Sequence, residues 1–312
     1  MEQQQTNRIG FIDIAKGIGI LLVVIGHLIS EKSIPGKMIY SFHMPLFWFL
    51  SGCFLRSGGG GRNFIVRKYN TLLVPCFAFT CICGLAEYYL LGNDKVFCNL
   101  SYELPGALWF LPNLFVSSVL FATIINIKHN WAKFLFAFVV IYLCQMRFNL
   151  HQFPYKLHYT PYALFFVAVG HFYRTYNAYP SIISKYARML MFLGLSILFH
   201  ILLYVVLPKC THIECITILH ILTAVCGIAL IIIISKWIEC YSNCSVLKYL
   251  GRNTLVIMSL HVLYMHMCLE FIKPHVANWL LYKSIEISVV LFLCVLSIEV
   301  INRQFRFILG KI

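Results

Sequence analysis

The stretch DIAKGIGILLVVIGH, residues 13–27, decides the fold class, because it is an apolar run that carries three ionisable side chains. Asp13, Lys16 and His27 frame a glycine-marked segment that, with its apolar neighbours, is long enough to cross a bilayer. Ionisable groups inside a membrane helix are costly and usually mark a functional site. The stretch therefore predicts a membrane helix with a functional face.

The composition of the whole chain supports a membrane protein. Its 312 residues are 60% hydrophobic and 12% charged, whereas soluble proteins are about half apolar and a quarter charged. We predict an all-α, polytopic membrane protein that forms a single domain over residues 1–312. Hydropathy places about ten spans at 9–30, 39–55, 71–91, 108–127, 134–151, 157–173, 187–207, 214–235, 254–272 and 280–301.

The positions of lysine and arginine predict the orientation of these helices. With a cytoplasmic N-terminus, 17 of the 25 basic residues fall on the inner side. This bias follows the positive-inside rule and predicts that both termini are cytoplasmic. The net charge of +14 is explained by the inner loops, so we expect a lipid bilayer and no nucleic acid as partner. The basic stretch RSGGGGRNFIVRK, residues 56–68, is predicted to be an inner loop.

Cysteine and histidine usage gives little evidence of metal. Most of the 13 cysteines fall in predicted spans, where they are expected to act as small buried hydrophobes. Cys210 and Cys215 share a predicted outer loop, and whether they form a disulfide is left open. No second cluster of ligands accompanies them, and we expect no metal site.

On a helix, the three ionisable groups of the opening stretch share one face. At about 100° and 1.5 Å per residue, Asp13 and Lys16 are neighbours, and His27 lies about 16 Å beyond Lys16. A ligand channel through most of the membrane requires such a face. The alternative is that Asp13 stabilises the helix N-terminus, Lys16 reaches the headgroups and His27 only packs.

Three further motifs place polar residues in or beside predicted spans. SFHMPLFWFLSG, residues 41–52, carries His43 among interfacial aromatic residues, and LWFLPNLF, residues 108–115, alone indicates another aromatic belt. LGRNTLVIMSLH, residues 250–261, combines the predicted inner-loop residues Arg252 and Asn253 with His261. Asn253 also suits a helix N-cap.

The chain resembles the integral-membrane acyltransferase-3 family, especially its fucose 4-O-acetylase-like acetyltransferase branch. The resemblance covers essentially the whole chain and rests on five motifs in the family's order. They are DIAKGIGILLVVIGH, FHMPLFWFLSG, FIVRKYNTLLVPC, LWFLPNLF and LGRNTLVIMSLH.

The resemblance implies roles for individual residues. It implies that His27 is catalytic and that Lys16, where many relatives carry arginine, serves the acyl-donor site. The family's basic site at the start of the third helix maps to Arg67, but its second arginine, three positions later, is Asn70 here. We assign Lys68 and Trp109 to the donor site as well, Asp13 and His43 to the catalytic group, and Asn253 and His261 as further candidates.

The expected reaction is O-acetylation of a carbohydrate or glycolipid in the cell membrane, here expected to be a bacterial inner membrane. Acetyl-CoA would be the acyl donor, its phosphates bound by the basic inner face. His27 would take the proton of the acceptor hydroxyl, since imidazole titrates near neutral pH. The competing hypothesis is a transporter or flippase for a lipid-linked sugar or small anion, in which the same ionisable groups would line a permeation path.

Overall fold

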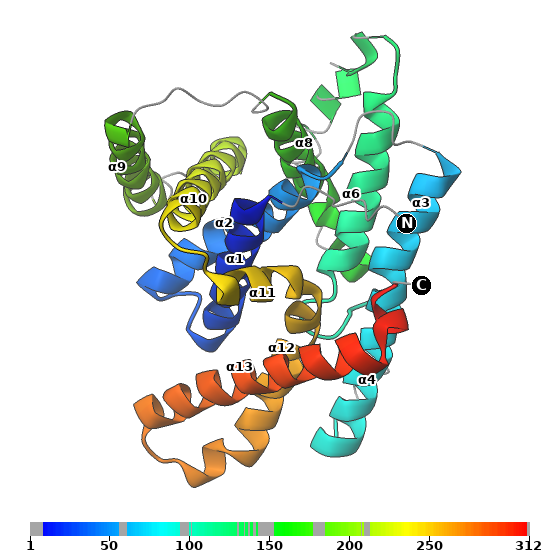
Figure 1. Ribbon diagram of the computed structural model, residues 1–312, viewed down its shortest axis with the longest axis vertical. Coiled ribbons are helices and arrows are strands. Elements are labelled where there is room, and N and C mark those ends of the chain that lie inside the picture. Colours follow the sequence, from blue (N-terminus) through cyan, green and yellow to red (C-terminus); the bar gives the residue numbers. More distant parts are fainter. Residues whose placement is uncertain are drawn as a thin grey trace. The chain divides into compact units, whose positions relative to one another are not determined.

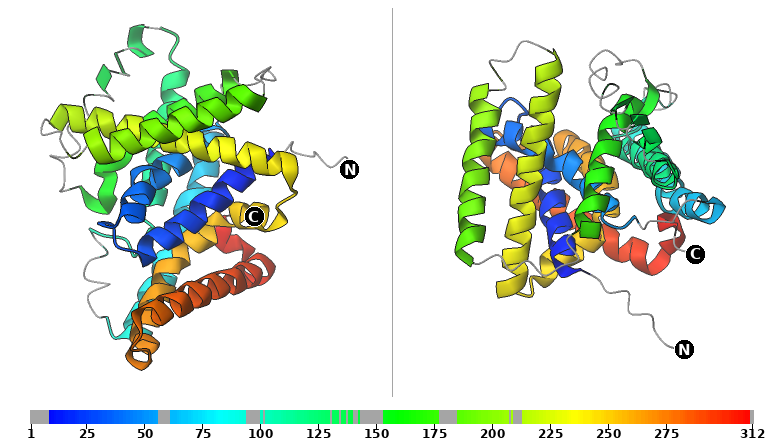
Figure 2. Two further views of the ribbon diagram at one scale, coloured as in Figure 1. Left: turned by 90° about the vertical axis from the view of Figure 1, so that its left-hand side faces the viewer. Right: turned by 90° about the horizontal axis from the view of Figure 1, so that it is seen from above.

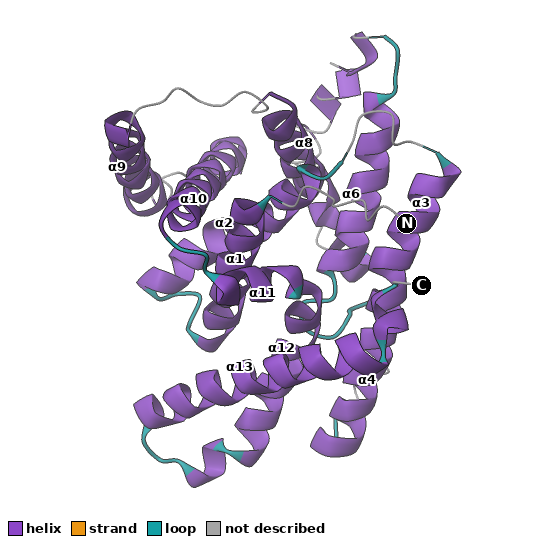
Figure 3. Cartoon of the chain, in the orientation of Figure 1, coloured by secondary structure: helices purple, strands orange, loops and turns teal. Residues whose placement is uncertain are grey.

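The protein is helical throughout the part of the chain that the computed structural model describes. This part comprises residues 9–55, 61–93, 102–129, 153–176, 185–206 and 213–310, with a few isolated positions between them. Every regular segment drawn in Figure 3 is a helix. The prediction of an all-α protein is confirmed. The predicted pair Cys210 and Cys215 and most of the predicted span 134–151 fall outside the described side chains.

The other nine predicted spans each overlap a helix. The helices are α1 (Gly10–Leu28), α2 (Ile34–Gly52), α3 (Arg62–Lys68), η1 (Tyr69–Leu73), α4 (Val74–Leu91), α6 (Phe110–Ile125), α8 (Thr160–Tyr176), α9 (Lys185–Ile201), η4 (Leu202–Val206), α10 (Ile213–Tyr241), α11 (Ser245–Arg252), α12 (Thr254–Phe271) and α13 (Trp279–Gln304). Short 3₁₀ turns at Pro154–Tyr159, Lys273–His275 and Arg306–Leu309 complete the described elements.

Five helical segments in the described residues are long and apolar enough to cross a membrane. They are Gly10–Leu28, Arg62–Leu91, Thr217–Tyr241, Thr254–His275 and Trp279–Gln304. Two shorter apolar helices, Phe110–Ile125 and Leu190–Val206, accompany them. A hydrophobic stretch of about 20 residues is what a bilayer core of about 30 Å requires. The fold is thus that of a multi-pass membrane protein.

The chain divides into two compact units, of which the first comprises residues 1–47 and 180–254. In this unit α1 packs against both α10 and α11, and α9 lies beside α10 (Figure 2). Glycines allow the closest of these approaches. A methyl group at Gly17 would overlap the carbonyl oxygen of Leu247, and one at Gly251 would overlap that of Asp13. Helices α1 and α11 therefore cross with their backbones in contact.

The second unit comprises residues 48–179 and 255–312. Here α6 packs against α8, and the Trp48 ring stacks on Phe110 with 5.8 Å between centroids. Helices α12 and α13 form a hairpin that is visible in Figure 1. The segments α3, η1 and α4 form one helical run from Arg62 to Leu91, 30 residues long.

Two segments that the sequence predicts to be inner loops are helical. Residues 62–68 form α3 and extend the third helix toward its N-terminus, where Phe64 is buried. Arg252 is the last residue of α11, a short amphipathic helix that the hydropathy pattern did not reveal. Hydropathy detects helices that are apolar on all sides, whereas α11 has one apolar face only and α3 carries three basic residues among seven.

Candidate functional site

An ion pair lies at the N-terminal end of α1. The Asp13 carboxylate accepts a hydrogen bond from Nε of Arg252 at 2.9 Å. The Asp13 side chain is 14% exposed and that of Arg252 is 47% exposed. The pair forms because Gly251 brings the end of α11 against the first turns of α1. Asp13 is therefore an anchor for α11, and 14 residues of helix, about 21 Å, separate it from His27.

Two predicted residues lie close in sequence to this ion pair. Lys16 follows Asp13 by one turn and is partly buried. Asn253 directly follows α11, and its side-chain amide donates to the Tyr249 carbonyl at 2.9 Å. Asn253 thus closes the end of α11, and it also directly precedes α12, at the position where the sequence predicts an N-cap.

His27 lies at the other end of α1, beside the start of α2. It is exposed, and its Nδ1 is 3.4 Å from the Tyr40 hydroxyl. The two rings meet edge to face at an interplanar angle of 81°. Tyr40 reaches His27 because the connection between α1 and α2, residues 29–33, is short. The sequence pattern gave Tyr40 no role, since contact across a hairpin depends on the turn.

His43 lies one turn after Tyr40 on α2 and is 5% exposed. Its ring packs edge to face on Tyr40, with 5.1 Å between centroids. The Nδ1 atom is 2.8 Å from the Ile39 carbonyl oxygen, which only accepts hydrogen bonds, so Nδ1 carries a proton. The structure thus brings His43 toward His27 through Tyr40, and neutral His43 presents an accepting Nε2.

The neighbours of Tyr40 determine which His27 nitrogen is basic. The Glu31 carboxylate lies close enough to the Tyr40 hydroxyl to interact with it. A carboxylate only accepts, so the Tyr40 proton is directed to Glu31 and the phenol oxygen can accept from Nδ1–H of His27. With this order, Glu31 to Tyr40 to His27, Nε2 would be the unprotonated nitrogen of a neutral His27 ring.

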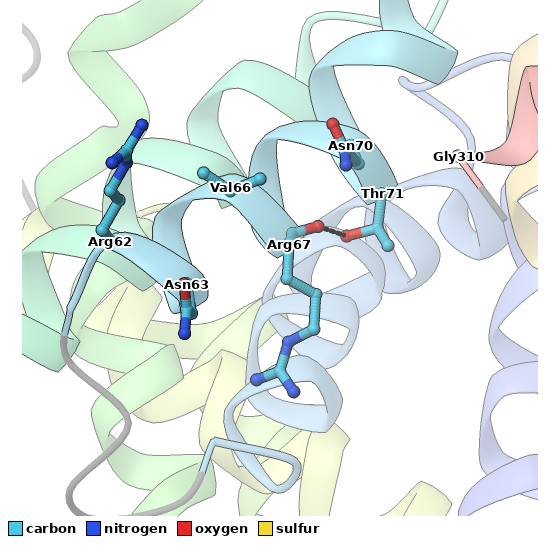
Figure 4. A pocket seen from close by; sticks show the side chains of 7 residues that line it. All are labelled: Arg62, Asn63, Val66, Arg67, Asn70, Thr71 and Gly310. Atoms are coloured by element: carbon cyan, nitrogen blue, oxygen red, sulfur yellow. Dashed lines mark hydrogen bonds between the residues drawn. The ribbon is translucent and has the colours of Figure 1, made fainter. Parts of the chain in front are cut away.

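Cationic side chains gather in a pocket on α3 and η1 of the second unit. The pocket has a volume of about 330 Å³ and is lined by Arg62, Asn63, Val66, Arg67, Asn70, Thr71 and Gly310. None of these side chains is acidic. Figure 4 shows the guanidinium groups of Arg62 and Arg67 extending in different directions from the helix. Arg62 supplies a second arginine to this pocket, and Asn70 also lines it.

The other two predicted donor residues lie outside this lining. The Lys68 ammonium lies 5.8 Å from the centroid of the Phe64 ring. Trp109 directly precedes α6, and its ring packs on Tyr159 and lies 5.5 Å from the Lys156 ammonium. The structure therefore places Arg67 in a cationic pocket and Trp109 in an aromatic contact of its own.

Buried polar groups hold the Trp109 segment and His261 in place. The Asn113 amide, which is fully buried, donates to the Trp109 carbonyl at 2.9 Å and accepts from Thr160 at 2.9 Å. His261 is fully buried in α12, with Nδ1 2.9 Å from the Ile257 carbonyl oxygen. As for His43, this fixes the proton on Nδ1 in the neutral ring. Neutral His261 is thus suited to accept a proton rather than to donate a hydrogen bond from Nε2.

Comparison with known proteins gives a family match over nearly the whole chain. A family model described as an acyltransferase domain matches residues 9–300. Nodulation protein NolL of Mesorhizobium japonicum is 35% identical over 132 residues, which are 36% of this chain and 35% of that protein. Nodulation protein NolL of Sinorhizobium fredii is 32% identical over 146 residues, 40% of this chain and 39% of that protein. The matched segment thus spans less than half the length of these relatives. No solved structure matches the chain significantly.

Proposed function

Because the chain belongs to the acyltransferase-3 family of integral membrane proteins, we propose that it moves an acetyl group from cytoplasmic acetyl-CoA to a hydroxyl of a cell-envelope or exported carbohydrate. The observation that supports this reaction is the His27 imidazole at one end of α1, with Nδ1 directed to Tyr40. In this arrangement an unprotonated Nε2 would be a proton acceptor suited to acyl transfer to an alcohol.

The cationic pocket on α3 supports a donor that carries phosphates. Arg62 and Arg67 supply charge, and Asn63, Asn70 and Thr71 supply hydrogen-bonding groups. Arginine pairs well with phosphate through parallel hydrogen bonds. These residues would bind the nucleotide end of the donor, and Lys16 would serve the donor on α1. Lys68 and Trp109 stay as predicted contributors whose contacts lie outside this pocket.

In the proposed step, Nε2 of His27 removes the proton from the acceptor hydroxyl. The oxygen forms a bond to the thioester carbonyl carbon, and the carbon–sulfur bond breaks. The proton held by His27 then passes to the departing thiolate, which balances the reaction. Tyr40 and Glu31 would orient the ring and favour the Nδ1–H form, in which Nε2 carries no proton. His43 contacts Tyr40 and would support its position.

The proposed topology has ten membrane helices with both termini in the cytoplasm. It is supported by the bias of basic residues toward one side and by the nine predicted spans that coincide with helices. This orientation places the Asp13 and Arg62 ends of their helices at the cytoplasmic surface. A donor made in the cytoplasm would then reach the cationic pocket directly.

The proposal is tested by transfer from labelled donor. Protein purified into nanodiscs is incubated with radiolabelled acetyl-CoA and a panel of glycans, and the labelled product is identified. Label in a glycan that depends on His27 supports the proposal. Movement of unmodified glycan across a vesicle membrane, with no label transferred, would favour the transporter hypothesis.

A further inference from the structure

A second polar pocket lies between the C-terminal end of α12 and the N-terminal end of α13, far from the cationic pocket. It has a volume of about 310 Å³ and is lined by Met265, His266, Leu269, Lys273, Trp279, Tyr282, Lys283 and Glu286. Its volume is at the lower end of the range for small-molecule sites, about 300 to 1,000 Å³. Neither the proposed reaction nor the predicted site residues use this pocket.

The base of this hairpin pocket is a buried carboxylate with fixed partners. Glu286 is 3% exposed although α13 is one of the long apolar helices. Its two oxygens accept from the Tyr282 hydroxyl at 3.1 Å and from the Lys283 ammonium at 2.7 Å. Each carboxylate oxygen can accept a further hydrogen bond, so Glu286 is oriented to accept from a ligand. Buried carboxylates in membrane helices are expensive and are functional by default.

A second buried carboxylate supports the rim of the pocket. Glu87, at 6% exposure, lies 3.4 Å from Nδ1 of His266 and accepts from the Asn93 amide at 3.1 Å. Trp279 at the rim is 66% exposed. The pocket thus joins hydrogen-bond acceptors and donors at its base to a broad aromatic face at its rim.

The two pockets lie at opposite ends of one helical run. Arg62 begins the run and Glu87 lies near its end, 25 residues later, which is about 37 Å along a helix. The hydrocarbon core of a bilayer is about 30 Å thick. If the pocket at Arg62 binds a donor from the cytoplasm, the hairpin pocket therefore lies at the extracytoplasmic surface.

We propose that the hairpin pocket binds the carbohydrate acceptor, an assignment that rests on the proposed acetyl transfer. Sugar hydroxyls donate to Glu286 and accept from Lys273 and His266, and the apolar face of a sugar ring packs on Trp279. Aromatic and lysine side chains at a membrane surface also serve as anchors. Anchoring does not explain the buried, hydrogen-bonded carboxylates below them, whereas carboxylates fixed in this way are suited to accept hydrogen bonds from hydroxyl groups.

The test measures glycan binding and acetyl transfer separately, with full-length protein in nanodiscs. The probes are cellotetraose, chitotetraose and tetragalacturonate, which represent neutral, N-acetylated and acidic glycans. Trp279→Ala is expected to weaken binding of the preferred probe about fivefold and to raise its KM equally, with the KM for acetyl-CoA unchanged. Glu286→Gln is expected to act in the same way. The exposed neighbour Leu280 and the exposed Glu299 give the matched controls Leu280→Ala and Glu299→Gln.

The outcomes separate this assignment from the proposed function. The pocket assignment is supported if a glycan binds in the absence of acetyl-CoA and this binding is lost in Trp279→Ala and Glu286→Gln. This holds even if no acetyl group is transferred. If acetyl transfer to a glycan occurs while both variants keep wild-type glycan binding and KM, the pocket assignment is overturned and the reaction stands. If none of the three probes binds, the pocket assignment is also overturned. Trp279→Ala alters an exposed side chain, so it remains informative if Glu286→Gln fails to fold.

Discussion

At the scale of single residues, the chemistry depends on which histidine nitrogen carries the proton. Nδ1 of His43 and of His261 faces a backbone carbonyl, whereas Nδ1 of His27 faces a tyrosine hydroxyl. A carbonyl fixes the tautomer by itself, but a hydroxyl can donate or accept. The role of His27 therefore depends on Tyr40 and, through it, on Glu31.

Tyr40→Phe tests this dependence. The variant loses the hydroxyl that lies 3.4 Å from Nδ1 of His27. We expect kcat to fall about tenfold, the equivalent of one positioning hydrogen bond, with the KM for acetyl-CoA unchanged. Tyr204→Phe is the matched control, because the Tyr204 hydroxyl donates to the Ile34 carbonyl in the same unit. Steady-state kinetics of both variants checks the prediction. Equal rates for Tyr40→Phe and the wild type would exclude a positioning role.

The arginines of the cationic pocket give a prediction about donor binding. Arg62→Gln and Arg67→Gln are each expected to raise the KM for acetyl-CoA severalfold, and more at low salt, where charge attraction is less screened. Arg306→Gln serves as the control, since Arg306 is exposed and lies outside the pocket lining. If both pocket variants keep the wild-type donor KM, the donor site lies elsewhere.

Sequence patterns predicted the residue types of the site better than their partners. The period of a helix placed Asp13, Lys16 and His27 on one face, and none of them is buried. The same pattern contained no information on Arg252 as the partner of Asp13, because that contact joins residues 239 positions apart. Contacts of this range depend on helix packing, which one helix's periodicity does not encode.

At the scale of elements, apolar helices were predictable and amphipathic ones were not. A hydropathy window located α1, α10, α12 and α13 to within a few residues, except for the C-terminal end of α10. It missed α3 and α11, whose arginines and lysines lower the average although Phe64 and Leu250 are buried. The helical period, applied to the polar segments as well, would have revealed α11.

The crossing of α1 and α11 gives a prediction about stability. Gly17→Ala puts a methyl group against the Leu247 carbonyl, so the helices must separate and the Asp13–Arg252 ion pair is strained. We expect a loss of about 1 to 3 kcal/mol in stability, as for other overpacked sites. The control is Gly194→Ala, because the space around a Cβ at Gly194 is open. Thermal unfolding in detergent compares the two, and equal midpoints would contradict the close crossing.

At the scale of the whole molecule, the proposed reaction depends on membrane topology. In a cysteine-free background, Asn63→Cys and Lys185→Cys are expected to react with an impermeant thiol reagent only after the cytoplasmic side is opened. Ser33→Cys, between α1 and α2, is expected to react in intact cells. Labelling of Asn63→Cys and Ser33→Cys from the same side would contradict the ten-helix topology.

His27→Gln tests whether His27 is the general base of an acetyl transfer. Glutamine keeps a hydrogen-bonding group near Tyr40 but cannot accept the proton. We expect normal assembly, retained acetyl-CoA binding and a rate about 10²- to 10⁴-fold below that of the wild type, with His27→Ala equally inactive. We also expect that the wild-type rate rises as pH passes the imidazole pKa, about 6.5, because only the neutral ring accepts a proton. Full transfer activity in His27→Gln would contradict the role of His27 as general base.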